Sequence, residues 1–486
     1  MDYLDATGLN LLDLAVIVFY LLLCVFIGIK VGGKPTDSNT YFRTSGNTPW
    51  WAVSFSIVAT ETSMLTVISI PAVAYTGSFV FLQLVFGYII GRFIVAWLIL
   101  PSYFKGDQKT AYTFFKERFG TRFQKVISVV FLMTRLLADG VRLFAAAIPI
   151  KVITGLDYPV AIAIIAVLTL AYTYYGGLKS VIWIDVLQLG VYIFGAIYIL
   201  LYTAGILEDS VFDYIADAGK TTLIVLPTSF GDAYTITYTL AAGIFGGMFL
   251  SMASHGTDQL IVQRLMACRD LRASQWALIA SGFFVLIQIT LFLIVGMYLY
   301  TWYQGAHFTE LGLANNDEII LRYVLDVIPH GAAGLFIAGL FAAAMSTLSS
   351  SLSALSSSTL FDLFPKLSER DDAIFISRMM MVVWTVIFFM FAVSFSDTEN
   401  PIVELGLGIA GFTYGALLGA FYIGRYTSYT TREVFPGLIA CVVGMIFVIS
   451  FSNLAWPWFT LTGVIIFFTV STLIYGINRI FGLKRY

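Results

Sequence analysis

Five serines in one apolar segment have the chemistry and the spacing to hold a small cation. Residues 331–361 place them at i, i+3, i+4, i+7 and i+11, which aligns them on one face of a helix: Ser346, Ser349, Ser350, Ser353 and Ser357. Hydroxyl oxygens are hard, neutral ligands that suit an ion such as Na⁺. The alternative is that serine and alanine here only allow close packing of helices.

A carboxylate elsewhere in the chain could complete such a site. Asp185 is the last residue of the stretch YGGLKSVIWID and lies about one turn inside another apolar segment. A buried carboxylate surrounded by hydroxyl groups is a reasonable ligand for an alkali cation. The alternative is an aspartate at a helix end that is held by nearby backbone groups.

Two apolar segments are interrupted by polar residues at the depth of a membrane centre. Residues 50–76 contain the run Ala59-Thr60-Glu61-Thr62-Ser63, followed by Pro71. Residues 236–262 contain Gly246-Gly247 and then Ser251, Ser254, His255, Gly256 and Thr257. Such interrupted segments in matching positions predict broken helices that form a binding site at the midplane. His255 is either a solute contact or a hydrogen-bonded interior residue.

A third segment, residues 126–153, carries a charged face. Arg135, Asp139 and Arg142 fall at i, i+4 and i+7. Ionisable side chains in a membrane cost several kcal/mol and normally face the protein interior or an aqueous cavity. Asp139 can pair with either arginine, which leaves the other guanidinium free or paired with Glu61. A wholly structural charge cluster is the alternative.

The elements that must position these residues are membrane-spanning helices. The chain has 486 residues, of which 59% are hydrophobic and 12% charged, whereas soluble proteins are about 45–50% apolar and about 25% charged. Segments long enough to span a bilayer recur along the whole chain, which predicts an all-α polytopic membrane protein with one domain, residues 1–486. We expect about 13 spans, near residues 11–31, 50–76, 79–102, 126–153, 158–175, 181–204, 236–262, 274–302, 331–361, 373–395, 402–424, 434–453 and 457–481.

The basic residues orient these spans. Most of the 27 Lys and Arg fall in one set of loops if the N-terminus is outside, and the positive-inside rule makes that set cytoplasmic. Arg264 is counted among these loop residues. The C-terminus is then cytoplasmic, and the long loops 205–235 and 303–330 are external. Net charge and cysteine positions indicate neither nucleic-acid binding nor a zinc or disulfide framework.

The two interrupted segments also suggest an internal repeat. Each is the first of five consecutive spans, in residues 50–204 and residues 236–424. This spacing fits a five-plus-five inverted repeat. One extra helix, residues 11–31, precedes the repeats, and two, within residues 434–481, follow them.

Several motifs resemble the sodium:solute symporter family, which includes bacterial proline, galactose and sialic acid symporters. They are SIPAVAYTGS (69–78), TAYTFFKERFG (110–120), GGLKSVIWIDVLQ (176–188), GTDQLIVQRLMACRD (256–270) and GLFAAAMSTLSSSLSALSSS (339–358). The resemblance extends over residues 11–480 and implies the LeuT-type fold.

The resemblance also implies two sodium sites. The main site would use Ala59 and Thr62 of the first core helix with three residues of the eighth, Ala343, Ser346 and Thr347. A second site, found in members similar to the sialic acid symporters, would use Asp185, Ser346, Ser349 and Ser350.

Alignment with the sialic acid symporters implies solute contacts at Glu61, Ser63, Thr66, Gln83 and Arg135, where Arg135 would hold a carboxylate. We add Asp139, Arg142 and His255 as further candidates. Glu61 departs from the pattern of the sialic acid symporters, which have a hydroxyl residue there. An acid beside a base suggests a carboxylate-bearing or zwitterionic solute, such as an amino acid or a sialic-acid-like compound. The alternative is an internal ion pair beside a neutral sugar or polyol.

The expected function is secondary active symport of a small solute with Na⁺ in the plasma membrane, by implication the bacterial inner membrane. The sequence has no P-loop pattern, which argues against ATP-driven transport, and no HExxH or GxSxG motif that would suggest an enzyme. We expect no catalytic or cofactor-binding residues and no obligatory protein partner. An uncoupled facilitator or channel of the same fold is the remaining alternative.

Overall fold

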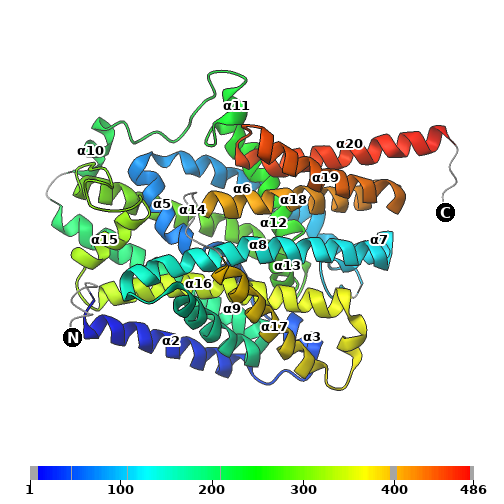
Figure 1. The fold of residues 1–486 in the computed structure, drawn as a ribbon, viewed down its shortest axis with the longest axis horizontal. Coiled ribbons are helices and arrows are strands. Elements are labelled where there is room, and N and C mark those ends of the chain that lie inside the picture. Colours follow the sequence, from blue (N-terminus) through cyan, green and yellow to red (C-terminus); the bar gives the residue numbers. More distant parts are fainter. Residues whose placement is uncertain (1–8, 45, 107, 208–209, 395–401, 482–486) are drawn as a thin grey trace.

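The computed structural model is helical throughout the part of the chain that it describes. It describes residues 9–481 apart from residues 45, 107, 208–209 and 395–401, and only the backbone of residues 152–153 and 402–412. Among these residues the only extended pairing is an isolated bridge between Thr48 and Cys268. Most of the long helices run along the longest axis of the molecule (Figure 1). The expected all-α class is confirmed.

Eight helices among the described residues are long and apolar enough to cross a membrane, and a bent helix pair, described below, brings the number to nine. The eight are α2 (Leu11–Gly32), α6 (Leu82–Ile94, with its flanking turns), α9 (Tyr158–Ile206), α14 (Leu271–Trp302), α16 (Ala332–Ser358), α17 (Ala373–Val393), α19 (Thr431–Phe451) and α20 (Phe459–Ile480). Two further long helices are α8 (Thr121–Thr154), which carries the charged face, and α18 (Ile402–Tyr426). The total of thirteen spans and the inverted repeat stay predictions.

Helix α9 joins two segments that the sequence separates, residues 158–175 and 181–204. Its 49 residues are interrupted at Gly177, whose backbone has φ 57° and ψ −150°. A Cβ atom at this position would lie 2.3 Å from the carbonyl oxygen of Tyr41, in the short helix α3 (Ser38–Arg43). Glycine therefore allows both the positive φ and the close approach that turn the chain between the two halves.

Both polar interruptions correspond to breaks between helices. Helix α4 (Trp50–Glu61) and helix α5 (Met64–Thr76) are separated at Thr62–Ser63 and bent by 69°. Helix α12 (Gly247–Gly256) and helix α13 (Gln259–Leu265) are separated at Thr257–Asp258. The side chain of Asp258 accepts a hydrogen bond from Leu260 N at 2.9 Å and so caps the start of α13.

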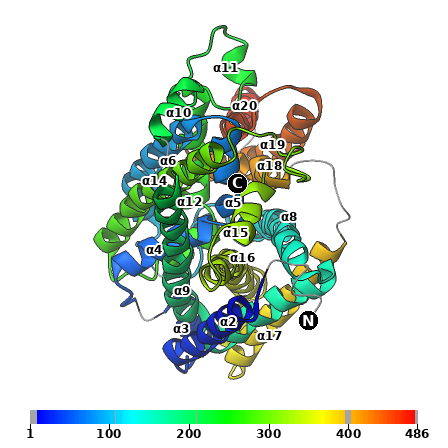
Figure 2. The same ribbon diagram turned by 90° about the vertical axis from the view of Figure 1, so that its left-hand side faces the viewer.

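Helix α16, which carries the serine stripe, lies within the bundle. It packs against α2, α4, α8, α9 and α17 and is surrounded by helices when viewed end-on (Figure 2). Its run of alanine and serine lets the neighbouring backbones approach closely. At its start, Asp13 of α2 accepts hydrogen bonds from Gly331 N and Gly334 N at 2.6 and 2.9 Å.

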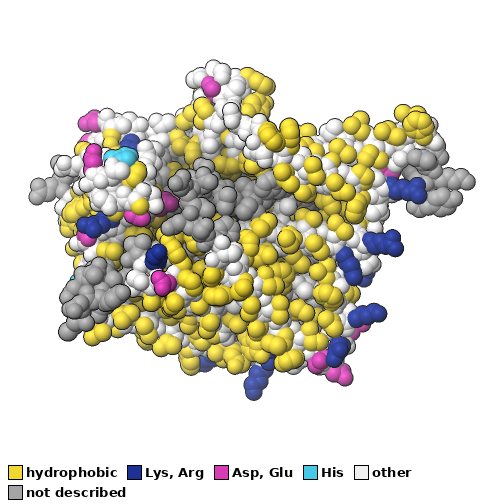
Figure 3. Space-filling view, viewed as in Figure 1, with side chains coloured by type: hydrophobic (Ala, Val, Ile, Leu, Met, Phe, Trp, Pro, Cys, Tyr) yellow, Lys and Arg dark blue, Asp and Glu magenta, His cyan; other side chains and the backbone are white. Residues whose placement is uncertain are grey.

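The surface agrees with a protein that crosses a membrane several times. Hydrophobic side chains cover the middle of the face drawn in Figure 3, and most charged side chains gather toward its two ends. The short helices α7 (Thr113–Phe119), α10 (Val211–Asp217), α11 (Asp232–Thr235) and α15 (Glu318–Asp326) lie in segments that connect the long ones.

Candidate functional site

A cavity of about 260 Å³ lies beside the break between α4 and α5. Its wall also includes residues of α8, α12, α13, α14 and α18, together with Trp456 from the turn before α20. Most of the predicted solute contacts and one predicted sodium ligand line it: Glu61, Thr62, Ser63, Thr66, Arg135, Arg142 and His255. The fold therefore brings together residues that are almost 200 positions apart.

Glu61 is paired inside the protein, but with a different arginine from the one considered above. Its Oε2 accepts a hydrogen bond from Arg92 Nη2 at 2.5 Å, and its Oε1 contacts His255 Nε2. Arg92, on α6, is fully buried and also donates to Ser281 Oγ at 2.8 Å. The interpretation that Glu61 pairs with an arginine of α8 is therefore wrong. About a quarter of the Glu61 side chain, 23%, stays exposed.

Arg135 lies in a second network of charged residues, and only one of its partners, Asp139, comes from its own helix. It donates from Nε and Nη2 to Asp258 Oδ2, from Nη2 to Tyr414 Oη at 2.7 Å, and from Nη1 to Asp139 at 3.4 Å. Asp258 and Tyr414 are buried. Because nearly all of the guanidinium donors are used, Arg135 is held in one orientation by the protein itself.

Arg142 is the more accessible arginine of the charged face. Its Nη1 donates to Asp139 Oδ1 at 2.9 Å, as the spacing predicts. Its side chain is 23% exposed, compared with 7% for Arg135, and it lines the cavity. Asp139 lies behind the two arginines and also accepts from Ser351 Oγ at 2.5 Å.

Gln83 does not face the cavity. Its Nε2 donates to Val80 O and Tyr238 O, and its Oε1 accepts from Val225 N, each at 3.1 Å. The side chain is therefore occupied by the loop between α10 and α12, and the residue is only 1% exposed. The alignment that suggested a solute contact could not reveal this loop contact.

Four of the five residues expected at the main sodium site lie close together, and Thr62 is the exception. Ser346 Oγ is 3.0 Å from both Ala59 O, on α4, and Ala343 O, on its own helix. Thr347 Oγ1 is 3.2 Å from Ala343 O. Thr62 caps the end of α4, and its hydroxyl contacts Val58 O and Gln288 instead of α16.

The residues expected at the second sodium site are bridged by an arginine. Arg264 Nη2 donates to Asp185 Oδ2 at 3.2 Å and also to Ser350 Oγ, while its Nε donates to Ser56 Oγ at 2.9 Å. Arg264 is fully buried, so its assignment to a cytoplasmic loop is wrong. It lies on α13, the short second half of a broken helix, which the count of long apolar runs does not detect.

Several buried polar atoms near Asp185 have no hydrogen-bond partner among the described residues. They are Asp185 Oδ1, both side-chain polar atoms of Gln188 and Tyr192 Oη. All three residues belong to α9, and Ser349 Oγ, on the facing helix α16, donates to its own backbone at Ser346 O at 3.1 Å. Gln188 is not among the candidates that the sequence patterns indicate, although its spacing of three residues from Asp185 places both on one face of the helix.

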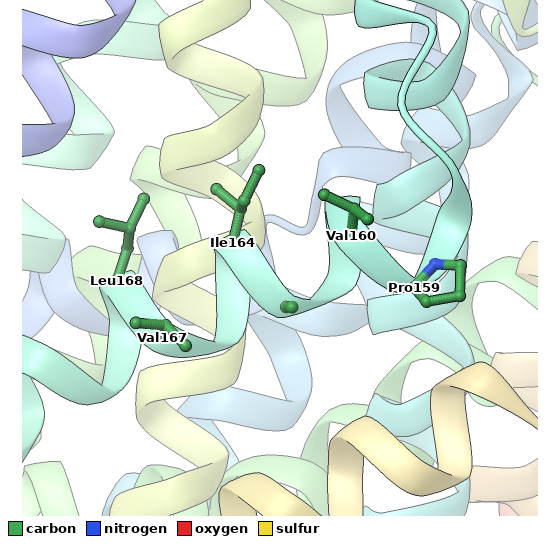
Figure 4. A pocket seen from close by; sticks show the side chains of 6 residues that line it. Pro159, Val160, Ile164, Val167 and Leu168 are labelled. Atoms are coloured by element: carbon green, nitrogen blue, oxygen red, sulfur yellow. The ribbon is translucent and has the colours of Figure 1, made fainter.

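A depression on the outside of α9 is lined only by apolar residues, unlike the cavity beside the α4–α5 break. It is lined by Pro159, Val160, Ala163, Ile164, Val167 and Leu168 (Figure 4). Val160 and Val167 are 46% and 63% exposed. Since this lining offers no hydrogen-bonding side chain, the depression suits contact with lipid tails and not with a polar solute.

Comparison with known proteins gives the same picture. The sodium:solute symporter family matches residues 41–433. The sodium/sialic acid symporter of Proteus mirabilis is 25% identical, over 90% of this chain and 89% of its own. That of Aliivibrio fischeri is 24% identical, over 97% and 94%. The sodium-dependent multivitamin transporter of Oryctolagus cuniculus is 26% identical, over 84% and 65%.

Solved structures agree in fold. A substrate-bound, outward-open sodium-coupled sialic acid symporter matches with a TM-score of 0.84 and 24% identity, over 96% of this chain and 98% of its own. A nucleobase-cation-symport-1 transporter in a closed conformation matches with a TM-score of 0.54 and 14% identity, over 93% and 98%. The relatives are sodium-coupled transporters and not enzymes, as expected. The chain belongs to the sodium:solute symporter family and is a multi-pass, sodium-coupled membrane transporter.

Proposed function

We propose that this protein imports a small polar organic solute together with Na⁺ by alternating access, and that the solute binds in the cavity beside the α4–α5 break. The observation that carries this proposal is the position of the end of α4, Ala59–Glu61, between the serines of α16 and the cavity. Ala59, whose carbonyl contacts Ser346 Oγ at 3.0 Å, is only two residues from Glu61 in the cavity wall. Sodium binding and solute binding therefore act on the same break, which is a direct way to couple them.

The proposed architecture is the LeuT-type five-plus-five inverted repeat, formed by residues 50–204 and 236–424. Its support is the match to a sialic acid symporter over 96% of the chain. The N-terminus would lie outside and the C-terminus in the cytoplasm of a bacterial cell, with the protein in the inner membrane.

Two sodium sites are proposed. The main site would be formed by Ala59, Thr62, Ala343, Ser346 and Thr347, and the second by Asp185, Ser346, Ser349 and Ser350. Support for the main site is the convergence of two backbone carbonyls on Ser346 Oγ. Support for the second is Asp185 Oδ1, which has no partner among the described residues although Oδ2 is paired with Arg264, because a buried polar atom normally has a hydrogen-bond partner or a bound ion.

The favoured solute carries a carboxylate, alone or as part of a zwitterion. Arg142 is the guanidinium that reaches the cavity with donors to spare, since its single ion pair among the described residues is with Asp139. A guanidinium can hold a carboxylate through two parallel hydrogen bonds. Arg135 would hold Asp139, the partner of Arg142, in place. Glu61 would accept a hydrogen bond from an ammonium or hydroxyl group of the solute.

A neutral sugar or polyol is the second candidate, and one observation favours it. The carboxylate in the cavity wall, Glu61, and the two paired with its arginines, Asp139 and Asp258, are matched within the protein by Arg92, Arg135 and Arg142. A site whose charges are already paired needs no charge from its solute. Ser63, Thr66, Ser69, Ser254 and Gln288 would supply neutral hydrogen-bonding groups.

Uptake in proteoliposomes tests the transport proposal. A solute panel is offered under an inward Na⁺ gradient and under an equal K⁺ gradient, and accumulation above equilibrium should require Na⁺. Saturable flux that equilibrates the solute without Na⁺ would show an uncoupled facilitator instead.

Analogues of the best solute test the choice between the two classes. If a carboxylate is recognised, its amide should bind at least about tenfold more weakly, which corresponds to roughly 1.4 kcal/mol. Equal binding of the acid and the amide by the wild-type protein would reject the carboxylate proposal and leave the neutral class.

A further inference from the structure

A buried carboxylate at the far end of α16 takes part in neither the cavity nor the two proposed sodium sites. Asp362 lies in a single helical turn, Thr359–Leu363, that continues α16. It is only 1% exposed. Measured along the helix, it is 16 residues beyond Ser346, or roughly 24 Å at 1.5 Å per residue.

The partners of Asp362 are all neutral. Its Oδ1 accepts from Thr110 Oγ1 at 2.6 Å and from Gln124 Nε2 at 2.8 Å, and its Oδ2 accepts from Ser358 Oγ at 2.7 Å. They come from the segment before α7, from α8 and from the end of α16. No Lys, Arg or His of the described residues forms an ion pair with this carboxylate. Lys109, the basic residue next to Thr110, has its ammonium over the ring of Phe361, 5.6 Å from the centroid.

One position on the carboxylate is open, and an unused hydroxyl lies beside it. A carboxylate offers about four lone-pair positions, and three are used here. Ser128, one turn beyond Gln124 on α8, is 0% exposed and its Oγ has no hydrogen-bond partner among the described residues. This hydroxyl is nonetheless within electrostatic reach of Asp362. The Ser128 hydroxyl is therefore a fourth neutral oxygen beside this carboxylate, and it is available to bind a cation.

The chemistry of the Asp362 carboxylate and its neighbouring hydroxyls indicates which ligand they would bind. A buried carboxylate without a counter-charge is costly, so such groups are normally paired or bound to a metal ion. The candidate ligands for a metal ion are one carboxylate and the hydroxyls of Thr110, Ser128 and Ser358, and they include no histidine or cysteine. Such a set suits a hard cation, and the single negative charge suits a monovalent one.

We propose that Asp362 and Ser128, with Thr110 and Ser358, form a third Na⁺ site at the end of α16. The proposal rests on the proposed function. Na⁺ that leaves the main site would pass along the buried serines of α16 to a site at the cytoplasmic end of this helix. Thr110, from the segment before α7, and Gln124, from α8, both donate to the Asp362 carboxylate. An ion bound there would therefore change how these two segments contact α16.

Equilibrium binding of ²²Na⁺ to the purified full-length protein tests this site. The background variant Ser346→Ala/Asp185→Asn/Arg264→Gln removes ligands of both proposed central sites without leaving Arg264 buried and unpaired, and it should retain one saturable class of Na⁺ binding. Adding Asp362→Asn should abolish that class. Asparagine keeps Oδ1 for Thr110 and Gln124, and the Ser358 hydroxyl can turn to accept, so the fold should persist.

Two further variants sharpen the result. Ser128→Ala removes a hydroxyl that has no hydrogen-bond partner in good geometry among the described residues, so it should weaken the residual Na⁺ binding about tenfold with little loss of thermal stability. Asp371→Asn, a nearby carboxylate on an exposed loop, should change nothing. If the background variant binds no Na⁺, or if its binding survives Asp362→Asn, the third site does not exist. A protonated Asp362 carboxyl at neutral pH in saturating Na⁺, seen by infrared difference spectroscopy, would also overturn it.

Failure of the proposed central sites would look different. The background variant would then bind as much Na⁺ as the wild type, and Asp362→Asn in the otherwise wild-type protein would still remove one ion per molecule.

Discussion

Arg264 donates a hydrogen bond to Asp185 at 3.2 Å in the interior of the protein, although the two residues are 79 positions apart. The same guanidinium group also contacts Ser350. A sodium ion that used Asp185 Oδ2 and Ser350 Oγ would therefore compete with Arg264 for both oxygens. The arginine acts as a tethered cation at the proposed second site.

Replacing Arg264 by glutamine removes this competitor. We expect Arg264→Gln to lower the Na⁺ concentration for half-maximal uptake, because Asp185 then lacks its counter-charge and Na⁺ can supply it. The melting temperature of the variant should rise with Na⁺ more steeply than that of the wild type. Arg269→Gln, whose side chain is 79% exposed, is the control. An Arg264→Gln protein that folds well and has unchanged sodium activation would rule out the competition.

The Asp185→Asn variant needs a partner substitution to be informative. Alone, it leaves Arg264 buried without a carboxylate, which costs about 3–5 kcal/mol when a buried pair is broken, so expression should fall. Asp185→Asn/Arg264→Gln removes both charges and should express better. If Asp185 binds Na⁺, the double variant should show reduced cooperativity of sodium activation in uptake assays. Wild-type cooperativity in that protein would reject the second site.

Ser346→Ala should abolish sodium-driven uptake while the protein stays folded. The hydroxyl belongs to both proposed sodium sites, and alanine suits the helix, so the loss is one of ligands and not of packing. Ser356→Ala, on the same helix, is the matched control because the Ser356 hydroxyl is buried without a partner among the described residues. Uptake that keeps its wild-type sodium dependence in Ser346→Ala vesicles would contradict the assignment.

Glu61→Gln should destabilise the protein because it leaves Arg92 buried and unpaired. The expected loss is about 3–5 kcal/mol, measured as a lower melting temperature, and Arg92→Gln in the same chain should restore part of it. Asp372→Asn breaks an exposed ion pair with Arg370 and should have no measurable effect. If Glu61→Gln melts like the wild type, the carboxylate is not held by Arg92 in solution.

Arg142→Lys and Arg135→Lys should differ in what they damage. Arg142→Lys should lower solute affinity at least about tenfold if a carboxylate is recognised, because lysine lacks the planar pair of donors, and stability should change little. Arg135→Lys should lower stability, since Arg135 holds Asp258, Asp139 and Tyr414 together. The two effects are separated by measuring solute binding and the melting temperature of each variant. Strong loss of affinity in Arg135→Lys alone would return the carboxylate contact to Arg135.

The sequence by itself determined the properties that depend on local pattern. Composition and the length of apolar runs indicate a membrane protein, because each span must bury about 20 residues in lipid. The polar run Ala59–Ser63 predicts the broken helix, and the spacing of the serines predicts one helix face. The i, i+4, i+7 spacing of Arg135, Asp139 and Arg142 likewise predicts the ion pairs within α8.

Only the tertiary structure decided which charge meets which partner across helices. Glu61 pairs with Arg92 and not with Arg135, Arg135 takes Asp258, and Arg264 enters the core from a segment assigned to a loop. These pairings depend on how each helix is rotated and tilted against its neighbours. Periodicity defines the faces of a helix but not which face of another helix it will contact, so the sequence could name the charged residues of the site without pairing them correctly.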